Sequence, residues 1–548
     1  MRRDIFNSMT TLNSGMIVAP QPVAAEAGAE VLRSGGNAID AAVTCALVQG
    51  LVDPQMNGIG GYALLTMHLA GDTADEVVGI DAPATAGSKV SPRMWANDII
   101  GMNPDGWGYF LNGKVNDAGY TSICTPGTIK MLDMMLSRWG TRSWAEVCQP
   151  AIKVAEDGFM VYDKLARGWH EKARFPEACS LLEYIQRNPE ASRIYLKQGQ
   201  PYAAGEWFKN PDYGQTLRHL AAKGADDFYH GELAARMSAD LAANGAFFTA
   251  ADLANYSLRD AAPVQGTYRG YGIASATAPH GGATIVAIMN ILEGWDMASL
   301  GHNSPEYIYR LGMAMKAAFV DRNQHMADAN FVKVPLDWMC SKARGAYWRE
   351  VIDSGKPIEA SPVVTGTPTT THVTVVDKHG NCVALTHSLG ASSGVITPGL
   401  GFMYNNSMIN FDPYAGNANS IAPGKSRTTG MTPSIVYKDD KPMLVLGAPG
   451  ATRIITSCLQ VMLNVIDFGM SVAEAVHTPR IDCQINNIRC QTRIPEYVMA
   501  EVRKRHPIGH IPYSHGGMGL VQAIYIDPVT GALSGASDGG CDGMALAG

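Results

Sequence analysis

Apolar residues recur with helical spacing from the first part of the chain. Between 21 and 36, repeated alanines favour a helix, Pro22 suits its first turn, and the glycine pair at 35–36 stops it. Asn37 is a suitable N-cap for a second apolar helix over 38–51. The same spacing continues through 125–355, which predicts a largely helical middle. The clearest helices expected there are Thr128–Trp139, Trp144–Asp157 and Pro305–Asp321.

The pattern changes after Gly355. Residues 361–368 are rich in proline, threonine and valine, as an exposed linker is. Beyond them, short apolar runs separated by turn residues predict β-hairpins, with one long helix expected over 451–467. Hairpins and long helices together indicate stacked layers of antiparallel sheet and helix. The expected strands are 62–68 after a glycine-rich turn at 57–61, then 373–376 with 382–386, 434–438 with 442–447, and 522–526 with 532–537.

Composition places this chain among globular proteins. It has 548 residues, of which 46% are apolar and 17% charged, with a net charge of −7. At about 150 residues per domain, the length alone corresponds to roughly three to four units. A mild acidic excess without basic runs argues against nucleic acid as a partner. No membrane span is visible, and the start lacks the apolar core of a secretory signal, so we expect a cytoplasmic protein without a membrane partner.

Ten cysteines are scattered along the chain, and no two have the Cys-x-x-Cys spacing of a zinc or redox site. We expect them to be mostly small buried side chains rather than a disulfide framework. Isolated histidines such as His170 and His219 have no partner at ligand spacing, so we expect structural or exposed roles for them. Neither a metal nor a cofactor is predicted.

Two segments match the Gly-x-Ser-x-Gly motif of serine hydrolases, 390–394 and 535–539. That motif works only as an elbow between a strand and a helix. The first match is followed by Thr397-Pro398-Gly399, which cannot continue a helix, and the second lies too close to the chain end. We therefore expect turns at both places.

A second candidate nucleophile lies in Thr369-Thr370-Thr371-His372. A threonine hydroxyl is a weak nucleophile within a chain, but an N-terminal threonine has its own α-amine as the base. The chain would then have to cut itself before the threonine. A proline-containing linker leading into a core strand suits such a cut. On strand propensity alone, the threonine run is simply the start of a strand.

Four stretches together resemble the γ-glutamyltranspeptidase (glutathione hydrolase) family of N-terminal-nucleophile hydrolases. They are long, occur in family order, and span nearly the whole chain. They are 34–42 (Ser-Gly-Gly-Asn-Ala-Ile-Asp-Ala-Ala), 57–61 (Asn-Gly-Ile-Gly-Gly), 370–372 (Thr-Thr-His) with 377–381 (Asp-Lys-His-Gly-Asn), and 447–456 (Gly-Ala-Pro-Gly-Ala-Thr-Arg-Ile-Ile-Thr).

The resemblance implies an α+β fold, a four-layer αββα sandwich made as one precursor. Thr370 matches the threonine that begins the small subunit, so cleavage is expected between Thr369 and Thr370. The large, helix-rich subunit would be 1–369 and the small catalytic subunit 370–548, leaving open a further homo-oligomer. Ser388 matches a second hydroxyl residue that hydrogen-bonds the nucleophile. Gly450 and Ala451 match the pair whose amides form the oxyanion hole, which agrees with their place at the start of the predicted 451–467 helix.

The family's substrate contacts are less well matched. In that family, one arginine holds the α-carboxylate of a γ-glutamyl group and one aspartate holds its α-amine. These positions correspond here to Gly79 and Asn410, so both charged contacts are missing; Arg427 is the candidate replacement for the carboxylate contact. The remaining substrate-binding positions map to Gly390 for an asparagine, Ser407 for a glutamine, and Thr429 with Gly430 for paired serines.

Three functions follow from the resemblance. The leading one is a self-processing threonine amidohydrolase acting on a small amide, such as oxamate or another acyl amide, rather than on a standard γ-glutamyl compound. The second is a γ-glutamyltransferase or glutathione hydrolase with relocated contacts. The third is an unprocessed, non-catalytic member of the family.

Overall fold

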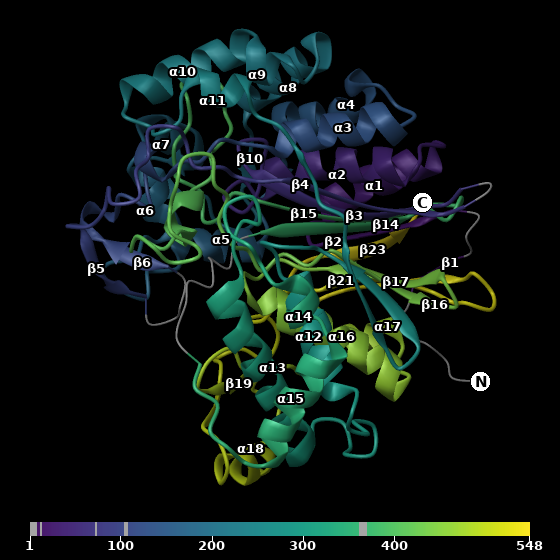
Figure 1. Ribbon diagram of the computed structural model, residues 1–548. Helices are drawn as coiled ribbons and strands as arrows, with labels where there is room; N and C mark the ends of the chain where they lie inside the picture. The colour runs from purple at the N-terminus through teal and green to yellow at the C-terminus, as the bar shows by residue number, and fades with distance from the viewer. Residues whose placement is uncertain (1–7, 11–13, 72–73, 104–107, 361–369) are drawn as a thin grey trace.

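Two seven-stranded sheets lie face to face at the centre of the molecule (Figure 1). The computed structural model describes residues 8–10, 14–71, 74–103, 108–360 and 370–548. In spatial order the first sheet contains β11 (Arg259–Asp260), β4 (Glu76–Ala82), β3 (Tyr62–Leu69), β15 (Cys382–Ser388), β14 (Thr371–Val376), β2 (Met16–Ala19) and β23 (Met544–Ala547). The second contains β1 (Ser8–Thr10), β22 (Leu533–Ser537), β21 (Gln522–Ile526), β17 (Lys441–Gly447), β16 (Ser434–Lys438), β13 (Tyr271–Ser275) and β12 (Val264–Tyr268).

Helices cover the outer face of each sheet (Figure 1). The first sheet is covered by α1 (Pro22–Arg33), α2 (Ala38–Val52), α3 (Thr128–Trp139), α4 (Trp144–Asp157) and α8 (Pro211–Lys223). The second is covered by α12 (Gly282–Leu292), α16 (Arg453–Phe468) and α17 (Val472–His477), and α13 (Pro305–His325) and α15 (Lys342–Asp353) pack on α12. The predicted four-layer αββα sandwich is therefore confirmed.

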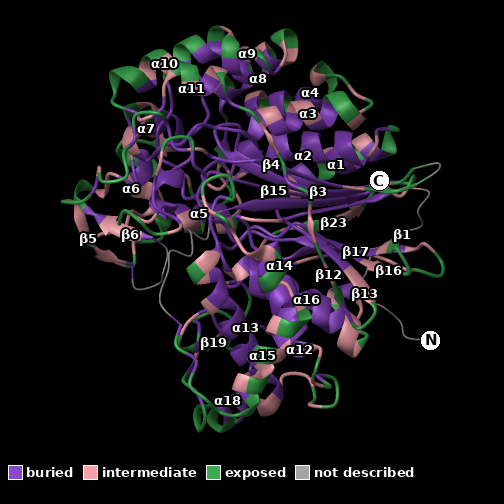
Figure 2. Ribbon diagram, in the orientation of Figure 1, coloured by how far each residue is buried: buried purple, intermediate pink, exposed green. Residues whose placement is uncertain are grey.

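Alternation along the strands explains this layering. Ile17 and Val375 pack against the helices, whereas Val18 and Val376 pack between the sheets. Both faces of these central strands are thus buried, and Figure 2 shows the buried centre of the molecule between exposed helix surfaces.

Smaller elements lie around this core. They include α5 (Asp163–His170), α6 (Leu181–Gln186), α7 (Pro189–Tyr195), α9 (Asp227–His230), α10 (Glu232–Ala243), α11 (Ala250–Ala254), α14 (Leu336–Met339), α18 (Glu496–Arg503), β5 (Ile99–Met102), β6 (Tyr109–Leu111), β7 (Phe159–Met160), β10 (Trp207–Phe208), β18 (Ile481–Asp482), β19 (Ile488–Cys490) and β20 (Ile508–His510).

Most predicted elements are present, and α3 and α4 have the predicted bounds. One helix start is wrong: α16 begins at Arg453, not at 451. Gly450 and Ala451 have φ of +140° and +55°, which no right-handed helix contains. The predicted linker at 361–368 lies outside the described residues.

Neither serine motif forms an elbow. Ser392 lies in a loop after β15 with φ of +67°, and no helix follows it. Ser537 is the last residue of β22 rather than part of a turn. The serine-hydrolase alternative is therefore unsupported.

The predicted subunit boundary divides both sheets. In the first sheet, β3 precedes Thr370 and pairs with β15, which follows it. In the second, β13 from the first part pairs with β16 from the second. The ranges 1–369 and 370–548 thus share one interleaved core rather than two independent ones.

All ten cysteines lie in the described part of the chain and are unpaired; seven are buried. Among the described residues, no helix is long and apolar enough to span a bilayer.

Candidate active site

Thr370 lies at the start of β14, beside the end of β15. Thr371 pairs with His387, which places Thr370 next to Ser388, and the Thr370 hydroxyl donates to Ser388 Oγ at 3.2 Å. Ser388 in turn pairs with Tyr62 on β3. Because paired strand residues share a face, Thr370, Ser388 and Tyr62 form a row that faces the second sheet.

The glycine-rich turn at 57–61 allows two backbones to approach this row. A Cβ on Gly61 would lie 2.2 Å from the Ser388 carbonyl oxygen, and one on Gly60 would lie 2.3 Å from that of Met403. The backbone and side-chain N–H groups of Asn405 both donate to the Gly60 carbonyl oxygen, at 3.1 and 3.0 Å. Only glycine fits such approaches, so the turn connects the Ser388 strand to the loop that carries Ser407 and Asn410.

A buried polar network fixes the other face of the same strand. Gln49 Nε2 donates to Thr371 Oγ1 at 3.0 Å, and Gln49 Oε1 contacts His387 Nε2 at 2.8 Å. Gln21 Nε2 also donates to Thr371 Oγ1, at 3.2 Å, and to Asp53 at 2.7 Å. Burial raises the pKa of Asp53. Helices α1 and α2 therefore hold the residue immediately after Thr370.

Gly450 and Ala451 lie in a tight loop before α16. A Cβ on Gly450 would lie 2.6 Å from Gly519 Cα, and a Cβ on Gly430 would lie 2.2 Å from the Ala451 carbonyl oxygen. The structure thus brings Gly430, a predicted substrate-binding position, against the predicted oxyanion loop. These amides precede the helix rather than belong to it, because Thr452 is the helix N-cap.

Three other predicted positions lie near Ser388 or in the neighbouring 405–410 segment, which includes the short 3-10 helix η3 (Ser407–Asn410). The Gly390 N–H donates to Ser388 Oγ at 2.9 Å. Asn410 is fully buried, yet neither its side-chain oxygen nor its nitrogen has a hydrogen-bond partner among the described residues; the same is true of Ser407 Oγ. Buried polar groups are normally paired, so these groups indicate a place for a ligand or water.

Position 79 cannot carry the family's arginine in this fold. A Cβ on Gly79 would lie 2.1 Å from the Ala261 carbonyl oxygen and 2.9 Å from the Pro263 ring. The segment after β11 therefore fills the space that a side chain would need.

Arg427 is buried and stacks on the Tyr62 ring, with its guanidinium carbon 4.5 Å from the ring centroid. One of its nitrogens donates to the Tyr62 hydroxyl and another to the Thr428 carbonyl oxygen at 3.0 Å. It forms no ion pair with any described carboxylate. Tyr62 belongs to the Thr370 row and lies two strand spacings from it, roughly 10 Å between the two backbones. Arg427 therefore places a buried positive charge against the Tyr62 end of that row.

His280, Asp81 and Thr429 form a cluster that the sequence analysis missed. His280 Nδ1 contacts Thr429 Oγ1 at 2.8 Å, and its Nε2 lies 3.1 Å from Asp81 but poorly aligned for a hydrogen bond. Arg322 donates to the carbonyl oxygens of both Thr429 (2.8 Å) and His280 (3.3 Å), and burial lowers its pKa to about 10. Asp81 and His280 are 199 residues apart, so no local pattern joins them.

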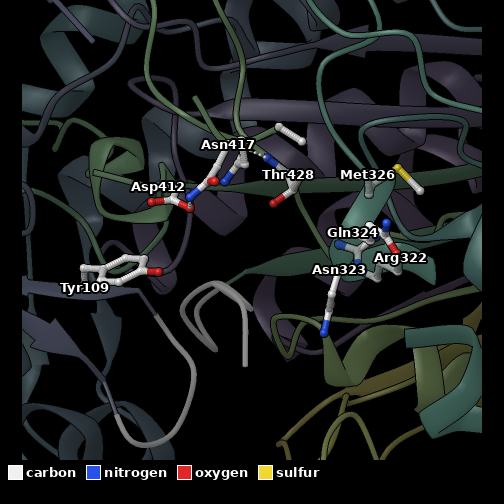
Figure 3. A pocket seen from close by; sticks show the side chains of 10 residues that line it. Tyr109, Arg322, Asn323, Gln324, Met326, Asp412, Asn417 and Thr428 are labelled. Carbon is white, nitrogen blue, oxygen red and sulfur yellow. Dashed lines mark hydrogen bonds between the residues drawn. The ribbon is translucent and has the colours of Figure 1, made fainter. Parts of the chain in front are cut away.

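Two cavities flank the 426–429 segment. A small one of about 10 Å³ is bordered by Tyr62, Asp81, His280, Arg427 and Thr429. A larger one of about 300 Å³ lies by Thr428 (Figure 3). Its walls come from the end of α13, from β6 and from the 412–419 loop, and they consist of Tyr109, Arg322, Asn323, Gln324, Met326, Asp412, Asn417, Ala418, Asn419 and Thr428.

The larger cavity is joined to the predicted acyl-binding positions by Asn419. Its side-chain nitrogen donates to the Asn410 carbonyl oxygen at 2.7 Å, and its side-chain oxygen accepts from the Thr428 N–H at 3.1 Å. Among the described residues, no cluster of three or more histidine, cysteine, aspartate or glutamate side chains is arranged to hold a metal ion.

Comparison with known proteins shows which family the chain belongs to. The family model described as gamma-glutamyltranspeptidase matches residues 24–548. The chain is 37% identical to the acylase ACY 1 proenzyme of Pseudomonas sp. (strain SE83), over 97% of this chain and 93% of the relative. It is 32% identical to the glutathione hydrolase proenzyme of Escherichia coli (strain K12), over 98% and 92%.

Among solved structures, the cephalosporin acylase from Bacillus halodurans matches with a TM-score of 0.87 and 26% identity, over 100% of this chain and 97% of that one. These matches extend over both sheets and all the motifs described above. The chain therefore belongs to the γ-glutamyltranspeptidase family, as an enzyme that acts on amide C–N bonds.

Proposed function

We propose that this chain is a self-processing N-terminal-threonine acylase that hydrolyses an amide whose acyl group carries no α-ammonium. Oxamate and longer carboxylate-bearing acyl amides fall in this class. The observation that carries the proposal is the Thr370 hydroxyl at the start of β14, 3.2 Å from Ser388 Oγ.

The reaction follows from this arrangement. After cleavage before Thr370, its free α-amine accepts the hydroxyl proton as Oγ1 attacks the substrate carbonyl. The amides of Gly450 and Ala451 stabilise the oxyanion. The C–N bond then breaks, the amine product leaves with the proton, and water hydrolyses the acyl ester to regenerate Thr370.

Substrate preference follows from charge. Asn410 offers one acceptor and one donor but no negative charge, so a substrate ammonium would remain uncompensated there. Removing one partner of a buried charge pair costs roughly 2–5 kcal/mol, about 30-fold to several thousandfold. Arg427, beside Tyr62, is the candidate contact for an acyl carboxylate.

The acylase name of one relative supports this preference, because that protein is called an acylase rather than a glutathione hydrolase. Both names belong to proenzymes, which supports processing of a precursor here.

Two chromogenic amides that differ only in the α-amine test the preference: glutaryl 4-nitroanilide and γ-glutamyl 4-nitroanilide. We expect kcat/KM for the glutaryl compound to exceed that for the γ-glutamyl compound at least about 30-fold. Equal values, or a preference for γ-glutamyl, would overturn the specificity. Ammonia release from oxamate, measured in parallel, shows whether the smallest acyl group is accepted.

The γ-glutamyl alternative has one observation in its favour. Asp81 and Arg427 border the same small cavity, so a negative and a positive group lie close together there. At about 10 Å³ the cavity has room for no more than a water, so it would have to widen to admit a zwitterionic head. An Asp81→Asn variant separates the two functions: it would abolish γ-glutamyl turnover in that alternative and leave glutaryl turnover unchanged in ours. A single band near 58.5 kDa on a denaturing gel would instead support the unprocessed, non-catalytic alternative.

A further inference from the structure

His372 lies two residues beyond Thr370 and faces the same space between the sheets. Its imidazole is fully buried. Nδ1 contacts Thr386 Oγ1 at 2.8 Å, and Nε2 contacts Thr374 Oγ1 at 3.0 Å. The Thr374 hydroxyl donates to the Gln522 carbonyl oxygen, at 3.0 Å, on β21 of the opposite sheet. The imidazole is therefore part of a polar chain that joins the two sheets inside an apolar layer.

The contacts determine the tautomer of this histidine. Thr374 has one hydroxyl proton and gives it to Gln522, so its oxygen must accept from His372 Nε2–H. Nδ1 is then the acceptor for the Thr386 hydroxyl. Burial, with a smaller contribution from His387, lowers the pKa of His372 to about 3, so the ring is neutral. With both nitrogens occupied, His372 is not available as a general base.

The same ring packs against the strand that leads into the Gly450–Ala451 loop. A Cβ on Gly447, the last residue of β17, would lie 2.2 Å from His372 Cε1. Gly447 is also the register partner of Gln522, which ends the polar chain. Two residues, Ala448 and Pro449, separate Gly447 from Gly450. The Leu520 N–H donates to the carbonyl oxygen of Pro449 at 2.9 Å.

We propose that His372 is a positioning residue: it sets the separation between the Thr370 hydroxyl and the Gly450 and Ala451 amides. The inference rests on the proposed function. It requires no contact between His372 and substrate. The imidazole acts as a spacer of fixed thickness between β14 and β17, while its hydrogen bonds fix its rotation. A displacement of about 1 Å in such a site costs on the order of 10²-fold in rate.

A pair of reciprocal variants tests the spacer. Gly447→Ala places a methyl group against the ring and should lower kcat for glutaryl 4-nitroanilide about 100-fold with KM little changed. His372→Ala removes the spacer and should also lower kcat. Because the alanine methyl occupies part of the vacated space, the double variant should be at least 10-fold faster than the product of the two single effects. Effects that simply multiply, or that act on KM, would overturn the inference.

Two further variants separate the proposed role of His372 from a general effect on packing and from proton transfer. Gly272→Ala in β13 adds a methyl in the same sheet at ordinary contact distance, 3.4 Å from Tyr437 Cβ, and should leave kcat unchanged. Thr374→Val preserves shape but removes the acceptor for His372 Nε2–H. It should lower kcat several-fold while leaving the pH midpoints of the kcat profile in place; a shifted midpoint would mean that His372 transfers protons.

The proposed function can fail separately from this inference. If Thr370→Ala is still cleaved or active, Thr370 is not the nucleophile, and the positioning role proposed for His372 is rejected with it. If Thr370→Ala is inert but the His372 and Gly447 effects multiply, only the spacer is rejected.

Discussion

At the scale of single residues, the proposed function assigns to Asn410 the choice of head group that the pocket accepts. Its amide is fully buried and unpartnered among the described residues, so an aspartate of the same shape fits there. Asn410→Asp should raise kcat/KM for γ-glutamyl 4-nitroanilide about 10-fold and lower it for the glutaryl compound, because the new carboxylate pairs with the ammonium and repels the second carboxylate.

The matched control for that variant is Asn417→Asp. Asn417 borders the larger cavity but is exposed. Its replacement by aspartate therefore adds the same negative charge at a place outside the proposed substrate contact. Neither substrate should respond by more than about twofold, since exposed charges are screened. An equal response to both variants would show that overall charge, rather than Asn410, sets the preference.

At Gly79, the position that the resemblance matches to the family's arginine, the fold leaves no room for a side chain. Gly79→Ala should destabilise the protein by about 1–3 kcal/mol, because its Cβ meets the Ala261 carbonyl oxygen at 2.1 Å. Gly101→Ala, at a position where a Cβ meets nothing within 4 Å, should leave the melting temperature unchanged. Thermal unfolding of both variants measures this difference in stability. Equal melting temperatures would mean that position 79 has room for a side chain.

At the scale of elements, α16 and the loop before it support the oxyanion assignment. Gly450→Ala adds a Cβ 2.6 Å from Gly519 Cα at a φ of +140°, so the loop must move and kcat should fall about 10²–10³-fold, the usual cost of losing one oxyanion donor. Gly469 caps the other end of the same helix, with a φ of +60° and open space around the position of a Cβ. Gly469→Ala is therefore the control variant. That control should lose about 1 kcal/mol of stability and no activity. Steady-state kinetics on glutaryl 4-nitroanilide measures both variants. Equal kcat values for the two would contradict the oxyanion role of Gly450 and Ala451.

Strands β14 and β15 make stability depend on pH. Burial lowers the pKa of both His372 and His387 to about 3, well below the ordinary value of about 6.5. Between these values the unfolded chain binds protons that the folded chain excludes, so this contribution to stability is fully present above about pH 6.5 and is lost as pH falls. Two such groups give a slope of up to about 2.7 kcal/mol per pH unit.

The melting temperature measured from pH 7.5 to 5 should therefore fall more steeply below pH 6.5. His387→Gln, which retains a hydrogen-bonding group beside Gln49, should make that decrease in melting temperature shallower. A melting temperature that is flat over this range, or a slope that the variant does not change, would contradict the buried neutral state of these histidines.

At the scale of the whole molecule, local patterns were sufficient for the elements but not for the site. The 3.6-residue periodicity and the Ser143 capping box specify α4, because both act within one or two turns. The α16 start was misplaced because Gly450 and Ala451 adopt positive φ under contacts from Gly519 and Gly430, which are distant in sequence. The His280–Asp81 pair was missed for the same reason. The resemblance supplied what periodicity could not: that Ser388 would hydrogen-bond Thr370. The approach of the glycine turn at 57–61 to Ser388 was not predicted and comes from the structure.

The two predicted subunits are interleaved, and this should keep them together after processing. Strands from both sides of Thr370 pair within each sheet, so cleavage before Thr370 should leave the two fragments associated. They should co-elute under native conditions and separate only when unfolded.

Intact mass and N-terminal sequencing of the purified protein test the central claim most directly. We predict two fragments whose masses sum to that of the chain plus one water, with the smaller fragment beginning Thr-Thr-His-Val at Thr370. Thr370→Ala should remain one chain and be inactive, whereas Thr370→Ser should still be cut because it retains the hydroxyl. A fragment that begins at another residue, or an uncut wild-type chain with full activity, would contradict the account.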